Sequence, residues 1–161
     1  MSKYILPYFG QLDTDSLDEY YDSSITINGL EINVDLNFDL VSIEPTRLEI
    51  AKRFLEQVTD FDFKNRKYIA DDFNNENADT VKTYIKSHLE EMGEDELNEL
   101  LDAGDKKTSN ELQMLKKIQL VRLGLYPGER EQFAVFDYSI GKEYTQYLVV
   151  VVVNEDGNME Y

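Results

Sequence analysis

The feature that most constrains the fold is a hairpin signal in the first quarter of the chain. Asn28-Gly29 separates a short β-branched run, Ile25–Ile27, from the segment Leu30–Phe38. An Asn-Gly pair supplies the two positive φ angles that a type I′ turn needs. After the turn, apolar side chains occupy every second position: Leu30, Ile32, Val34, Leu36 and Phe38. This alternation predicts a strand with one buried and one solvated face.

Helical spacing of apolar residues follows in the middle of the chain. Thr46-Arg47-Leu48-Glu49 matches a capping box, in which the Thr hydroxyl and the Glu carboxylate each bond a free backbone amide. We therefore expect a helix to begin at this motif, and Gly93 is placed to end a later one. The expected helical segments are 46–58, 61–73, 81–92 and 97–101.

Strand-like segments frame this helical block. Tyr4–Phe9 is an expected edge strand, because Pro7 cannot donate to a ladder. A second capping-box match, Thr108–Glu111, predicts the start of a short helix. Further strands are expected after it, at 121–125, 133–140 and 147–153. The continuously apolar run Tyr147–Val153 is typical of a central strand buried on both faces.

These segments predict an α+β fold in a single domain, residues 1–161. We expect a mostly antiparallel sheet, built from N-terminal and C-terminal strands. A central block of about four helices is expected to pack on it.

Composition limits the classes of partner. The 161 residues include 33 acidic and 16 basic side chains, a net charge of −17, and no cysteine. The absence of cysteine excludes a disulfide scaffold and a thiolate metal site. The negative charge opposes binding to nucleic-acid phosphates and to anionic membranes. The first residues lack a secretory pattern, and the longest apolar run, Leu148–Val153, is too short to span a membrane. We expect a cytoplasmic protein with no nucleic-acid or membrane partner.

The sequence assigns no catalytic, cofactor-binding or metal-ligating residue. His88 is the single histidine, and it lies on the apolar stripe of an expected helix with no second His or Cys to complete a ligand set. We expect it to be packed and hydrogen-bonded at the margin of the core. Two acidic motifs lack the ligand spacing and the glycine of a calcium loop. They are Asp13-x-Asp15-x-x-Asp18 and Asp60-x-Asp62.

Charge is also unevenly distributed. Acidic side chains are dense in the expected helix around Glu94–Asp102, whereas six lysines and arginines lie between Asp105 and Arg130. We predict that these six cations mainly face the protein's own acidic segments, especially the Glu94–Asp102 helix. Tyrosines near acids are typical of protein interfaces and also of ordinary sheet packing. They include Tyr20, Tyr21, Tyr138, Tyr144 and Tyr147.

Several segments together resemble a bacterial family of small acidic proteins of unknown function. The segments that carry the resemblance are Leu6–Gly10, Ile32–Phe38, Leu120–Pro127, Phe133–Tyr138 and the valine run that ends at Val153. They are structural strands rather than catalytic signatures. Small acidic proteins of this kind are considered as toxin-immunity proteins, and this analogy of type carries no site residues across.

Three functions are consistent with the sequence. The first is a non-catalytic intracellular protein-binding domain, of the immunity or inhibitor type, for a basic partner. The second is an enzyme that uses carboxylates, with or without a divalent metal. The third is a protein that self-associates through β edges or an apolar face, and the sequence leaves the oligomeric state open. The missing catalytic constellation and the charge of −17 favour the first function.

Overall fold

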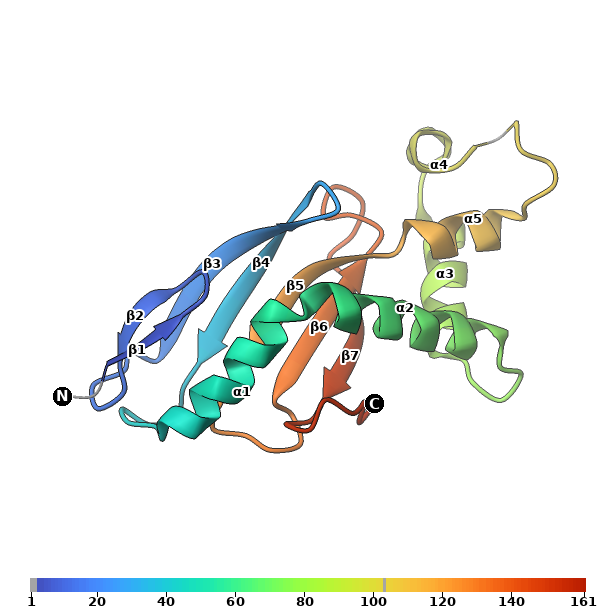
Figure 1. Cartoon of the computed structure of the whole chain (residues 1–161). Coiled ribbons are helices and arrows are strands. Elements are labelled where there is room, and N and C mark those ends of the chain that lie inside the picture. The colour runs from blue at the N-terminus through green and yellow to red at the C-terminus, as the bar shows by residue number, and fades with distance from the viewer. Residues whose placement is uncertain (1–2, 103) are drawn as a thin grey trace. The chain divides into compact units, whose positions relative to one another are not determined.

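The computed structural model describes residues 3–102 and 104–161, and it has the predicted α+β fold (Figure 1). The described residues form five helices, a two-stranded sheet and a mostly antiparallel five-stranded sheet. Met1, Ser2 and Ala103 lie outside the described residues. The elements are β1 (Lys3–Leu6), β2 (Gly10–Asp13), β3 (Tyr20–Ile27), β4 (Leu30–Asn37), α1 (Pro45–Glu56), α2 (Val58–Asn74), α3 (Thr80–Glu91), α4 (Glu94–Leu100), α5 (Asn110–Lys117), β5 (Gln119–Leu125), β6 (Ala134–Ser139) and β7 (Val149–Val153).

The chain groups into two compact units. The first unit comprises Met1–Asp62, Leu120–Asp137 and Val150–Tyr161, and the second comprises Phe63–Gln119 and Tyr138–Val149. The first unit therefore holds most of the five-stranded sheet together with α1, and the second holds α3, α4 and α5. That the whole chain forms one domain stays a prediction.

The predicted hairpin is confirmed as β3 and β4. Asn28 and Gly29 both have positive φ, 51° and 81°, and Ile27 pairs with Leu30 across the turn. The next strand to pair with β4 is β5, in parallel, and the order of the sheet is β3-β4-β5-β6-β7. Alternation along β4 buries Ile32, Val34 and Leu36 as expected.

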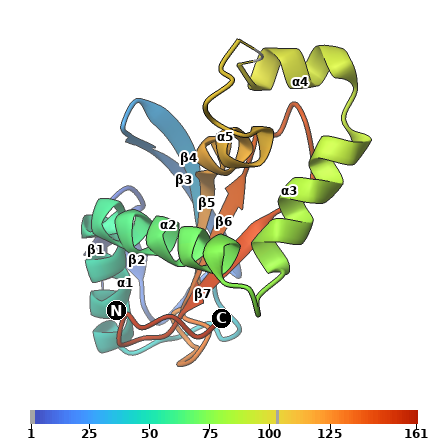
Figure 2. The ribbon, with the colours of Figure 1, turned by 90° about the vertical axis from the view of Figure 1, so that its right-hand side faces the viewer.

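The helix α1 lies across one face of the sheet in the first unit (Figures 1 and 2). Phe54 on α1 stacks on Phe61 and on Phe133, with ring centroids 4.5 and 5.3 Å apart. Arg47 holds the start of α1 by donating to the carbonyls of Pro127 and Glu129. This apolar layer, which we call the covered face, is the core of the first unit.

The helices begin at residues that differ from the predicted ones. The capping box at Thr46–Glu49 is wrong, because α1 begins at Pro45 and its N-cap is Glu44. Proline is favoured at the first helical position, where its missing N–H costs nothing, so the helix begins one residue before Thr46. At α5 the cap is Ser109, whose hydroxyl accepts from the Leu112 amide at 3.1 Å. Gly93 follows the end of α3 with φ −68°, so it does not form a left-handed cap and instead precedes α4.

The valine strand β7 is the last strand of the sheet, so its prediction as a central strand is wrong. The C-terminal residues fold back along its outer edge. The Val152 amide donates to the Tyr161 carbonyl at 2.8 Å, and the Glu160 amide donates to the Val152 carbonyl at 2.7 Å. Four of its five valines are buried, and Val150 is 42% exposed. Among the described residues, no helix is both long and apolar enough to cross a membrane.

Candidate functional site

The face of the sheet opposite α1 is polar, and within the described residues no helix of the first unit covers it (Figure 2). Because Ile32, Val34 and Leu36 point toward α1, the residues between them point the other way. The facing residues of β3 are all exposed. We call this side the open face, and it is formed by Tyr20, Asp22, Ser24, Thr26, Glu31, Asn33, Asp35, Asn37, Arg122 and Asp137.

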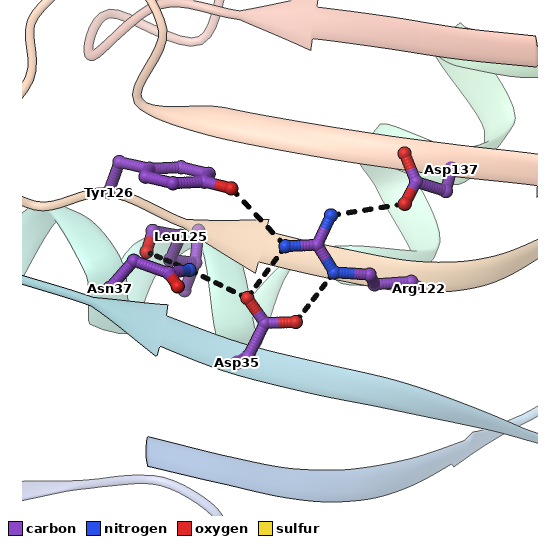
Figure 3. Close-up of polar contacts among 6 residues, drawn as sticks. All are labelled: Asp35, Asn37, Arg122, Leu125, Tyr126 and Asp137. Atoms are coloured by element: carbon purple, nitrogen blue, oxygen red, sulfur yellow. Dashed lines mark hydrogen bonds and ion pairs between the residues drawn. The ribbon is translucent and has the colours of Figure 1, made fainter. Parts of the chain in front are cut away.

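A bidentate ion pair lies at the centre of the open face (Figure 3). Arg122 Nε donates to Asp35 Oδ2 at 2.6 Å, and Arg122 Nη2 donates to Asp35 Oδ1 at 2.8 Å. Asp35 is 3% exposed although no helix of the first unit lies above it. The guanidinium therefore both neutralises this carboxylate and covers it.

Gly124 makes room for this pair. In the parallel register of β4 and β5, Asp35 lies opposite Gly124 and Asn33 lies opposite Arg122. The arginine side chain must cross the space above Gly124 to reach Asp35. A Cβ at Gly124 would lie only 2.4 Å from Arg122 Nη2. The glycine is thus a packing requirement of the ion pair rather than a turn residue.

Three further side chains complete the network. Arg122 Nη1 donates to Asp137 Oδ2 at 3.0 Å, and the Tyr126 hydroxyl lies 3.3 Å from Nη2 (Figure 3). Asn37 Nδ2 donates to Asp35 Oδ1 at 2.7 Å. The guanidinium thus makes four hydrogen bonds within the protein. An arginine has five N–H donors, so little capacity remains for an external anion.

Electrostatics make the open face negative. It has four carboxylates, those of Asp22, Glu31, Asp35 and Asp137, and one guanidinium. Burial raises the pKa of Asp137, and this effect outweighs the opposing hydrogen bond from Arg122. Desolvation, followed by the charges of Asp35 and Asp22, raises the pKa of the exposed Tyr20 hydroxyl. The hydrogen bond to Asp35 raises the pKa of Arg122, which stays fully charged.

Asp22 has no counter-ion within the part of the chain that the structure describes. It pairs directly with Asp35 across β3 and β4, so two carboxylates face each other on neighbouring strands. Like charges in this position destabilise a sheet. Arg122 serves Asp35 and leaves Asp22 at the edge without a cation.

His88 lies in the second unit and is 7% exposed. Its Nδ1 lies 2.6 Å from the Tyr84 carbonyl, and its Nε2 lies 2.9 Å from Thr145 Oγ1. Because a carbonyl only accepts, the proton of the neutral ring is assigned to Nδ1. The expected packed, hydrogen-bonded histidine is therefore found. A cavity of about 300 Å³ lies beside it, and its lining includes one carboxylate, that of Glu91.

The two acidic motifs lie in different elements, the first at the turn after β2 and the second inside α2. The Asp13 carboxylate accepts from the Asp15 amide at 3.0 Å and lies 3.7 Å from Lys3 Nζ. Asp62 is 4% exposed in α2. In residues 3–102 and 104–161, no three His, Asp or Glu side chains lie close enough together to hold a metal ion.

The prediction for the basic segment holds only in part. Arg122 does face the protein's own acids, but they are Asp35 and Asp137 rather than the residues of α4. Within the described residues none of the four lysines of the segment forms an ion pair. The loop between α4 and α5 is held instead by Gln113, which accepts from the Asp102 amide at 2.7 Å and donates to the carbonyls of Asp102 and Thr108.

No role was predicted for Asp35, Asp137 or Gln113. No local signal distinguished Asp35, because it occupies a polar position of the alternation along 30–38, as Glu31 and Asn33 do. The partner could not be read locally, because Arg122 lies 87 positions further along the chain.

Comparisons with known proteins found no match to this chain. No protein-family model matches the chain, and neither does any curated protein or solved structure. The resemblance to a bacterial family of small acidic proteins stays a prediction.

Proposed function

We propose that this chain is a non-catalytic protein-binding domain, of the inhibitor or immunity type, whose open face binds a basic partner. The observation that carries the proposal is the exposed, negative and tyrosine-bearing surface of β3 and β4. Tyr20 is 56% exposed there, in the field of Asp22 and Asp35. Tyrosine rings with charged neighbours are typical of protein interfaces, because the ring buries area while the hydroxyl stays solvated.

The state of the charged groups supports binding rather than catalysis. Asp35 and Arg122 saturate each other, as the four hydrogen bonds of the guanidinium show. A catalytic carboxylate instead needs an accessible position beside its substrate. Asp22 and Glu31 are exposed on the same face and are free to meet cations of a partner. Complementary charge of this kind mainly sets the rate of association and the choice of partner.

A pair of charge-reversal variants tests the proposal. Asp22→Lys with Glu31→Lys changes the open face, and Asp95→Lys with Glu96→Lys makes the same change of net charge on α4. Each protein, immobilised at equal density, is exposed to native lysate at low and at high salt. We expect a basic protein captured by the wild type and by the α4 variant, with capture by the open-face variant reduced by about tenfold or more, which corresponds to about 1.4 kcal/mol.

Two results would contradict the proposal. One is equal loss of capture in both variants, which would indicate attraction to net charge alone. The other is that no protein is bound by the wild type in preference to the open-face variant at either salt concentration.

A further inference from the structure

The two edge strands of the five-stranded sheet differ in whether other backbone pairs with their outer edge. On β7, the C-terminal residues pair with the outer edge through the bonds of Val152 with Glu160 and Tyr161, and just beyond the strand the Asn154 amide donates to the Asn158 carbonyl at 2.8 Å. On the other side, β3 pairs only with β4 within the described residues. The outer edge of β3 therefore has backbone groups with no strand beside them.

The turn fixes which groups point outward. In a two-residue hairpin the closing pair, here Ile27 and Leu30, exchanges both hydrogen bonds, and such pairs then alternate along the ladder. The backbone groups of Thr26, Ser24 and Asp22 consequently point away from β4. Their side chains lie on the open face and are exposed.

This edge lacks the devices that commonly block strand addition. Natural edge strands are short, bulged, or carry lysine or proline. β3 has eight residues, a one-to-one register from Tyr20 with Asn37 to Ile27 with Leu30, and neither lysine nor proline. Its only charged residue is Asp22.

We propose that β3 accepts an antiparallel strand from a basic partner, with alternate cationic side chains of that strand placed beside Asp22 on the open face. This inference rests on the proposed function and names the mode of binding. Charge complementarity selects the occupant, because Asp22 has no counter-ion within the described part of the chain. A second copy of this chain would instead bring its own Asp22 and a further charge of −17 to the same edge.

The other side of the added strand meets a different surface. Ser23 points to the covered face, and its hydroxyl donates to the Tyr8 carbonyl at 2.9 Å. Tyr8 has a backbone φ of 70°, which residues other than glycine rarely adopt. Tyr8 is also 55% exposed. This hydrogen bond helps hold Tyr8 in that conformation and places it close to Ser23. The partner strand should therefore alternate cationic residues with apolar ones.

The test uses the full chain and a capped seven-residue peptide of alternating lysine and valine. In antiparallel pairing with β3, the lysines that lie on the open face also direct their own N–H groups to β3. N-methylation of the lysine amides should abolish binding, whereas N-methylation of the valine amides should not. A slip of one residue cannot rescue the first analogue, because it would move every lysine to the other face.

Amide hydrogen exchange, followed residue by residue by NMR, reports the result. At a peptide concentration nine times its Kd, exchange at Asp22, Ser24 and Thr26 should slow about tenfold relative to the free protein. The lysine-methylated peptide and a glutamate-for-lysine peptide should leave these rates unchanged. The variant Ser24→Pro, which removes one outward N–H and no bond to β4, should weaken binding of the unmodified peptide, with circular dichroism as the check on folding.

The outcomes separate this inference from the proposed function. Equal binding of both methylated peptides, with loss of binding in the Asp22→Lys/Glu31→Lys variant, overturns strand addition and leaves the open face as a binding surface. Absence of binding by every basic peptide overturns both. Dimerisation of the free protein in sedimentation experiments, lost in Ser24→Pro, would show that the edge serves a second copy and would overturn the basic partner.

Discussion

The two faces of the five-stranded sheet bury their residues by opposite means. The covered face excludes water with stacked rings, in which Phe54 lies between Phe61 and Phe133. The open face buries two carboxylates under one guanidinium with no helix of the first unit above them. Both faces come from the same strands through their two-residue periodicity. The apolar face needs shape complementarity, whereas the polar face needs every hydrogen bond to be satisfied.

We expect the largest loss of stability from a substitution on the covered face. Phe54→Ala removes a ring that is 1% exposed and touches two others. We expect a loss of about 3–5 kcal/mol in the free energy of unfolding, from lost burial and the cavity left behind. Urea denaturation should give the same loss at pH 5 and pH 7, because no charge is changed. A loss below about 1 kcal/mol would mean that the stacked rings do not form the core.

Arg122→Met is the matching change on the open face. It leaves Asp35 and Asp137 buried without their cation, so we expect a loss of about 3 kcal/mol at pH 7. Burial already raises the pKa of Asp137, and removal of the cation raises its folded-state pKa further above the unfolded value. The penalty is therefore full above the folded pKa and shrinks as the pH falls through it.

The measurement for this variant is urea denaturation at pH 7 and at pH 4.5. Arg53→Met, which changes an exposed arginine on α1, should stay within about 0.5 kcal/mol of the wild type at both values. A loss for Arg122→Met that is equal at the two pH values would contradict the buried ion-pair network.

Gly124→Ala disturbs the ion pair of the open face without removing any polar group. The added Cβ would meet the Arg122 guanidinium at 2.4 Å, so the ion pair must shift. We expect a loss of about 1–3 kcal/mol, as for other cases of overpacking. Gly128→Ala is the control, because no heavy atom lies within 4 Å of its added Cβ, and it should be neutral or slightly stabilising by thermal denaturation.

Asp137→Asn should have the smallest effect and a characteristic pH dependence. Because burial raises the folded-state pKa of Asp137, the folded protein binds this proton more tightly than the unfolded chain. Its contribution to stability is present below the unfolded pKa and is lost as the pH rises through the folded pKa. The wild type should therefore gain stability relative to Asp137→Asn as the pH falls from 7 to 4. Denaturation of both proteins across this range, with Asp95→Asn as an exposed control, measures the difference.

Local signals explain what the sequence could predict. The hairpin of β3 and β4 was found because turn residues and alternation lie within fourteen positions of each other, from Ile25 to Phe38. The place of β7 was mispredicted for a non-local reason, since its edge is buried by the C-terminal residues that pair with Val152. The ion-pair network was missed because Asp35 meets Arg122 only through the parallel pairing of β4 and β5. The apolar periodicity of each strand does not indicate how β4 and β5 are aligned with each other.

The parallel pairing of β4 and β5 also has a consequence for folding kinetics. Asp35 and Arg122 are 87 positions apart, so the centre of the sheet closes only across a long loop of chain. Closure of long loops is entropically costly and slows folding, whereas the β3–β4 hairpin can form locally and early. Until the sheet closes, the five consecutive valines of β7 are exposed, and such a segment invites aggregation. A net charge of −17 keeps unfolded chains apart during that interval, so the acidity acts before the native structure exists.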